Sequence, residues 1–129
     1  METENQGMPI IKREDGYTTI EEVEIGLFYG LCTRPCCLIT KQCMHYQGEV
    51  RFRIAGTSAN ESVSGKSIMG LMTLEPYHGR KLTINIEGID EKAEELALRL
   101  YSGITTRNTI DDYCSMYFNR FERVNAPSG

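Results

Sequence analysis

Segments that alternate apolar and polar residues are interleaved along this chain with segments whose apolar residues recur at helical spacing. The clearest alternation covers residues 82–87, and a second covers Val50–Ile54, where two arginines separate the apolar residues. A period of two residues predicts strands with one buried and one solvated face. Residues 18–25 are rich in β-branched side chains and are also predicted to form a strand. The chain should therefore combine a sheet with helices, in an α+β fold.

Three segments have the pattern of helices. Pro35 stands where the first helical turn tolerates proline, and the helix around it is predicted to reach about residue 46. Ser67 is predicted to cap a short apolar helix. Asp90 should cap a third helix, which Gly103 would end and whose apolar stripe comprises Ala93, Leu96, Ala97 and Leu100. With a weaker strand at 61–64, the predicted order is βαββαβα.

The 129 residues fit one domain with short extensions. Residues 1–16 mix glycine, proline and charges without an apolar period, and we expect a flexible N-terminal arm there. Residues 17–104 should form the domain, and residues 105–129 a C-terminal extension.

The extension contains the pattern of an additional amphipathic helix. Thr109 followed by Asp112 is typical of a helix start. The apolar stripe consists of Ile110, Tyr113, Cys114, Tyr117, Phe118 and Phe121. A stripe this wide must be covered, either beside the last helix of the domain or by a homodimer or partner contact.

Charge and hydropathy exclude several classes of function. The net charge of −4 provides no global attraction to nucleic acid. The apolar runs are far shorter than the roughly 20 residues of a membrane span, and the polar N-terminus lacks a signal core. We therefore expect a cytoplasmic protein that binds neither nucleic acid nor membranes directly.

Five cysteines, four of them within residues 32–43, fit reduced thiols better than a secreted disulfide framework. Their spacing lacks the paired ligands of structural zinc sites, so we expect no metal and no cofactor. Packing in the core is the favoured role of the cysteines along the first helix. His45 and His78 are expected on the surface without a catalytic part.

Two separated motifs in this element order resemble the HPr family, the histidine-containing phosphocarriers of the bacterial sugar phosphotransferase system. Residues 30–35 read Gly-Leu-Cys-Thr-Arg-Pro, where the family has Gly-Leu-His-x-Arg-Pro, and residues 66–74 are similar to its regulatory-serine segment. The pattern of residues 82–91 is similar as well. The resemblance covers residues 18–104 and implies an open-faced β-sandwich, with a four-stranded antiparallel sheet and three helices on one face.

The first motif implies a former phosphorylation site at Cys32, with Arg34 assisting. Cysteine removes the imidazole nitrogen that carries the phosphoryl group in the family, so an inert Cys32 is the favoured interpretation. A helix N-terminus and an arginine can activate a thiol, so phosphoryl acceptance by Cys32 stays open. A redox pair with Cys36 is a third hypothesis.

The second motif implies a regulatory phosphorylation site at Ser67, although serine is also a common helix cap. In the family the neighbouring Ile68, Met69 and Met72 dock the kinase and transcriptional regulators. The HPr-like catabolite repression proteins likewise keep the serine and lose the histidine. The favoured hypothesis is thus a non-enzymatic regulatory protein that is phosphorylated on Ser67 by an HPr kinase/phosphorylase-like enzyme. Its further partners would be a transcriptional regulator or a phosphotransferase enzyme.

Overall fold

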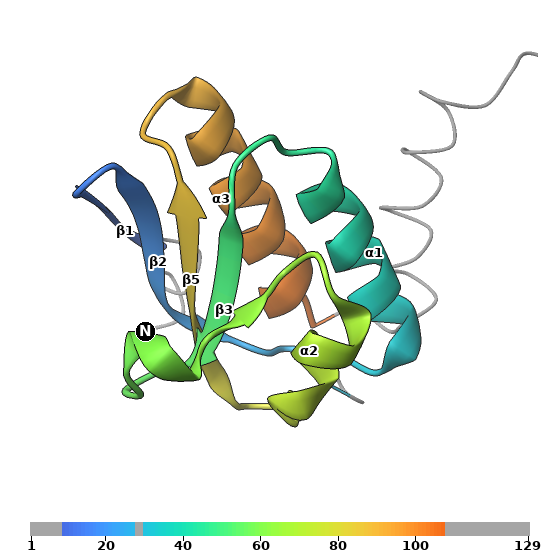
Figure 1. Cartoon of the computed structure of the whole chain (residues 1–129). Helices are drawn as coiled ribbons and strands as arrows, with labels where there is room; N and C mark the ends of the chain where they lie inside the picture. Colours follow the sequence, from blue (N-terminus) through green and yellow to red (C-terminus); the bar gives the residue numbers. More distant parts are fainter. Residues whose placement is uncertain (1–8, 28–29, 108–129) are drawn as a thin grey trace, which may run out of the picture.

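A computed structural model describes residues 9–27 and 30–107 of the chain. Figure 1 shows a sheet with its helices gathered on one face. The helices are α1 (Thr33–Met44), α2 (Ile68–Thr73) and α3 (Glu91–Thr105), with a short 3₁₀ helix at Ala59–Glu61. The strands are β1 (Ile10–Glu14), β2 (Tyr17–Glu24), β3 (Val50–Ile54), β4 (Val63–Ser64) and β5 (Lys81–Glu87). The α+β fold and the predicted βαββαβα order, from β2 to α3, are confirmed.

All strand pairs are antiparallel, in the order β1-β2-β5-β3-β4. The inner face of the sheet forms the core with the three helices, and Phe52 on β3 and Ile84 on β5 are fully buried there. The other face carries Arg51 opposite Asn85 and Arg53 opposite Thr83. The prediction of a polar outer face is therefore confirmed.

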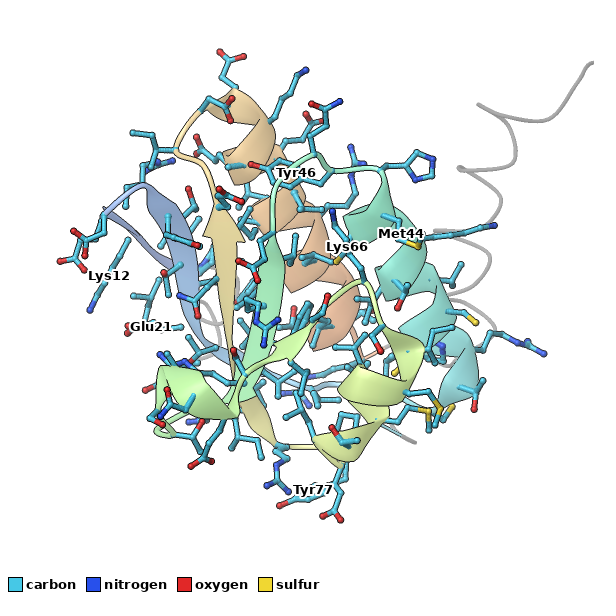
Figure 2. All side chains as sticks on the ribbon, in the orientation of Figure 1. Lys12, Glu21, Met44, Tyr46, Lys66 and Tyr77 are labelled. Carbon is cyan, nitrogen blue, oxygen red and sulfur yellow. The ribbon has the colours of Figure 1, made fainter. Side chains whose placement is uncertain are left out.

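Strand β1 differs from the expected loose arm. It pairs with β2 from Ile10 opposite Glu21 to Glu14 opposite Tyr17, which gives the sheet five strands where four were expected. Its half-buried Ile11 packs against the core. Figure 2 shows Lys12 beside Glu21, and their charged atoms are 3.4 Å apart. Pairing with β2 thus orders a segment that has no strand pattern of its own.

A bulge in β2 keeps its apolar residues on one face. Thr18 and Ile20 are buried with the usual alternation, but the next buried residue is Val23. The register with β5 shifts between Ile20 and Val23, and Glu22 takes a positive φ of 56°. The extra residue returns Val23 to the core side, as β-bulges do.

The third helix extends past Gly103, where we expected it to end. Ile104 is fully buried, and its carbonyl accepts a hydrogen bond from the Gly26 N–H at 2.9 Å. Burial of Ile104 therefore favours continuation of the helix past Gly103, and α3 ends at Thr105. Its predicted cap is confirmed, because the Asp90 side chain accepts from the Ala93 N–H at 3.1 Å.

The additional helix expected at residues 109–121, including Cys114, lies outside the described residues. Within the described ranges, no helix combines the length and apolar character that crossing a bilayer requires.

Candidate functional site

The segment that leads into α1 is fixed by a close approach of two loops. Gly30 has a positive φ of 74°, and a Cβ built there would lie 2.6 Å from the Pro76 carbonyl oxygen. The next residue, Leu31, donates its N–H to the same oxygen at 2.8 Å. Glycine is therefore required at this position, and the loop after α2 holds the start of α1 in place.

Cys32 is the N-cap residue of α1. Its backbone is extended, its carbonyl accepts from the Cys36 N–H at 3.1 Å, and its side chain is exposed and makes no capping hydrogen bond. Arg34, in the first turn, is exposed too. That turn has no acidic residue. The start of α1 thus carries an exposed thiol and an exposed guanidinium at the positive end of the helix dipole, and such a helix start can receive an anionic group.

The other thiols of α1 divide into buried and exposed ones. Cys36 and Cys43 are buried, as expected for packing residues. The pKa of the Cys36 thiol is raised to about 12, chiefly by burial and to a smaller extent by nearby Cys32 and Cys37. Burial likewise raises the pKa of Cys43 to about 12, against an opposing effect of Lys66. Cys37 is exposed, which corrects the expectation that it packs in the core.

Ser67 caps α2 and is partly exposed. Its Oγ accepts a hydrogen bond from the Gly70 N–H at 2.9 Å, which confirms its predicted capping role. The preceding Lys66 donates through Nζ to the Tyr46 carbonyl at 3.0 Å, which connects the start of α2 to the end of α1. Tyr46 and Lys66 lie in this region in Figure 2, while Tyr77 lies at the other end of the domain.

The three apolar residues expected around Ser67 differ in exposure. Met69 is 78% exposed and Met72 is 39% exposed. Ile68 is half-buried and packs against the core. The predicted docking patch is therefore formed mainly by the two methionines.

A groove along α1 connects the two motifs and was not predicted from the sequence. This groove, the α1 groove, has a volume of about 590 Å³. It is lined by Arg34, Cys37, Leu38, Thr40, Lys41, Met44 and Ile68. It therefore runs from the first turn of α1 to its last, with the start of α2 beside it.

The two histidines lie on the surface. His45 and His78 are both exposed, and His78 Nδ1 lies 3.1 Å from the Leu27 carbonyl oxygen. In the part of the chain that the structure describes, no three His, Cys, Asp or Glu side chains are grouped to hold a metal ion.

The comparisons with known proteins all indicate the same family. A family model described as "PTS HPr component phosphorylation site" matches residues 20–101. The phosphocarrier protein HPr of Borreliella burgdorferi is 40% identical over 79 residues, which cover 60% of this chain and 87% of the relative. The HPr-like protein Crh of Halalkalibacterium halodurans is 35% identical over 78 residues, which cover 60% of this chain and 88% of the relative.

Solved structures agree with this assignment. The crystal structure of a phosphocarrier protein HPr from Bacillus anthracis is 31% identical and superposes with a TM-score of 0.55, covering 67% of this chain and 98% of that one. Because the family model matches residues 20–101, more than half of the sequence, the chain belongs to the HPr family of the phosphotransferase system.

Proposed function

We propose that this chain is a regulatory member of the HPr family that acts in the cytoplasm, is phosphorylated on Ser67 and binds its partners through Met69, Met72 and Ile68. It works as a binding protein and not as an enzyme. The observation that carries the proposal is the partly exposed Ser67 side chain at the start of α2, next to two exposed methionines. An HPr-like protein Crh is among its relatives.

The surroundings of Ser67 suit a reversible modification. Its Oγ already accepts from the Gly70 N–H, and a phosphate oxygen could accept from the same group. The added charge of roughly −1.5 to −2 would lie at the positive end of α2, so the helix could stay folded. Phosphorylation would then change the charge beside the docking patch without rebuilding it.

Two methionines suit a patch that meets more than one partner. Their unbranched, polarizable side chains adapt to differently shaped surfaces. The proposed partners are an HPr kinase/phosphorylase-like enzyme and a transcriptional regulator or phosphotransferase enzyme.

A second candidate function is favoured by the exposure of Cys32 beside Arg34. A Cys32 thiolate would attack the phosphorus of a phosphorylated donor, so that an S–P bond forms while the bond from phosphorus to the donor breaks. Arg34 and the free amides of α1 would stabilise the charge of the transferred group. The redox alternative has less support, since the buried Cys36 thiol, with a pKa of about 12, is a poor thiolate source.

Phosphorylation assays separate these functions. The protein is incubated with ATP and a bacterial HPr kinase/phosphorylase, and separately with phosphoenolpyruvate and the first enzyme of the phosphotransferase system. We expect phosphate on Ser67 in the first reaction, located by mass spectrometry, and its loss in Ser67→Ala. Ser62→Ala is the matched control, because Ser62 is also partly exposed but its hydroxyl accepts from Arg51.

An unmodified Ser67 in the first reaction contradicts the regulatory proposal. In the second reaction, label that is present on the wild type and absent from Cys32→Ala would support phosphoryl acceptance by Cys32. Label that is absent, or unchanged in Cys32→Ala, removes that candidate.

A further inference from the structure

A histidine from another loop lies against the segment that leads into α1. His78 belongs to the loop of residues 74–80, which connects α2 to β5, and the Pro76 carbonyl of this loop accepts from the Leu31 N–H at 2.8 Å. A Cβ built on Gly30 would lie 3.2 Å from the His78 backbone nitrogen. Because Leu31 directly precedes Cys32, the fold brings His78 next to the motif in which cysteine stands at the position of the family's histidine.

Backbone hydrogen bonds fix the loop on both sides of His78. The Tyr77 carbonyl accepts from the Arg80 N–H at 3.1 Å, and the Gly79 N–H donates to the Ile25 carbonyl at 2.8 Å. The His78 side chain is nevertheless exposed. The loop thus presents a histidine from a fixed backbone to a partner protein.

The hydrogen bond of the imidazole determines which ring nitrogen is nucleophilic. His78 Nδ1 lies 3.1 Å from the Leu27 carbonyl oxygen. A carbonyl oxygen only accepts, so Nδ1 carries the hydrogen of this bond, and Nε2 carries the lone pair of the neutral ring. The same carbonyl accepts from the Gly30 N–H at 2.9 Å, which connects the ring to the first residue of the motif. Nε2 is therefore the nitrogen that can attack phosphorus.

Cations near the two ends of this contact suit a phosphoryl group. The Arg80 guanidinium lies over the Tyr77 ring, 4.7 Å from its centre, and Arg34 is exposed in the first turn of α1. Neither guanidinium forms an ion pair with a carboxylate of the described residues. Arg80 offsets the charge of Glu75, the acidic residue of the loop, and Arg34 adds a further cation.

We propose that His78 accepts a phosphoryl group on Nε2, from a donor protein that carries this group on a histidine nitrogen. The Nε2 lone pair attacks phosphorus, so that a new N–P bond forms while the bond from phosphorus to the donor nitrogen breaks and leaves its electron pair on that nitrogen. The proton that the phosphorylated ring then releases from Nδ1 balances the one that the departing donor nitrogen takes up. The proposal is independent of Ser67, and it differs from the Cys32 candidate in the residue that carries the group.

The chain has two histidines, which allows a direct test. Full-length wild type, Cys32→Ala, His45→Ala, His78→Ala and His78→Gln are incubated with labelled phosphoenolpyruvate and the first enzyme of the phosphotransferase system. His45→Ala is the matched control, because His45 is also exposed and its Nδ1 lies 2.8 Å from the Lys41 carbonyl oxygen. We expect label on the wild type, Cys32→Ala and His45→Ala, and loss of the label in both His78 variants. Circular dichroism checks that these variants are folded.

The chemistry of the bond provides a second readout on the wild type, which needs no variant. Phosphate on His78 should be lost in mild acid and retained in alkali, mass spectrometry should place it on the His78 peptide, and ³¹P NMR should identify the Nε2 isomer. Phosphate on Cys32, on His45 or on Nδ1 of His78 would overturn the proposal. A wild type that stays unlabelled would overturn it too, whereas an unmodified Ser67 in the kinase reaction would leave the proposal intact.

Discussion

At the scale of single residues, Gly30 meets two demands at once, a positive φ and a close approach to the Pro76 carbonyl. Gly30→Ala should lower the free energy of unfolding by more than the roughly 1–2 kcal/mol that a left-handed backbone costs a residue with a Cβ. Gly56→Ala is the matched control, because Gly56 has a φ of 92° but no atom within 4 Å of the added Cβ. Urea denaturation of both variants measures the difference, and equal losses would contradict the role of the loop contact.

The sequence predicts Cys32, Arg34 and Ser67 as candidate site residues, because motif spacing is a local property of the chain. Exposure is not local, which explains the error at Cys37. Cys37 follows the buried Cys36 in the sequence, but on the helix it points in a different direction. It therefore lines the α1 groove and is not part of the core. The face of α1 that packs against the core decides which of these two neighbouring cysteines is buried.

At the scale of elements, β1 is held by its contacts with β2 and the core. Ile11 lies opposite Ile20 and is half-buried, whereas Ile10 is 50% exposed. Ile11→Ser should therefore lower the free energy of unfolding by about 1 kcal/mol, through loss of part of a buried apolar side chain. Ile10→Ser should change it by less than about 0.5 kcal/mol, as surface substitutions usually do. Chemical denaturation of the two variants checks this, and losses of equal size would show that Ile11 is not packed as described.

The elements that were predicted well are those with complete local signals. The alternation of β3 and β5 and the caps Ser67 and Asp90 each depend on residues a few positions apart. Strand β1 was missed because Ile10 and Ile11 are adjacent and charges follow them, so the strand exists only through its pairing with β2. The α1 groove was missed for a similar reason, since it requires the packing of α1 against α2.

At the scale of the whole molecule, the two buried thiols connect stability to pH. Folding raises the pKa of Cys36 and Cys43 from 9.0 to about 12, chiefly through burial. Below about pH 9 the folded and the unfolded chain both keep the thiol protons of Cys36 and Cys43. Above pH 9 the unfolded chain loses these protons, while the folded chain still keeps them. The free energy of unfolding should therefore fall as pH rises from 9 towards 12, by up to about 1.4 kcal/mol per pH unit for each thiol.

Urea denaturation under reducing conditions between pH 7 and 10.5 measures this slope. Cys36→Ala/Cys43→Ala should flatten it. A slope that persists in the double variant would assign the pH dependence to other groups.

Strand β1 also determines which sheet edge is available for pairing with other molecules at high concentration. Every sheet edge is a template for cross-molecular pairing unless it is short or charged. Here one edge is β4, with two residues, and the other is β1, which displays Lys12, Arg13 and Glu14 to solvent. Without β1, the eight-residue β2 would be the edge. The charges on β1 should therefore oppose edge-to-edge pairing between molecules, and neutralising them should shorten the lag time of fibril formation.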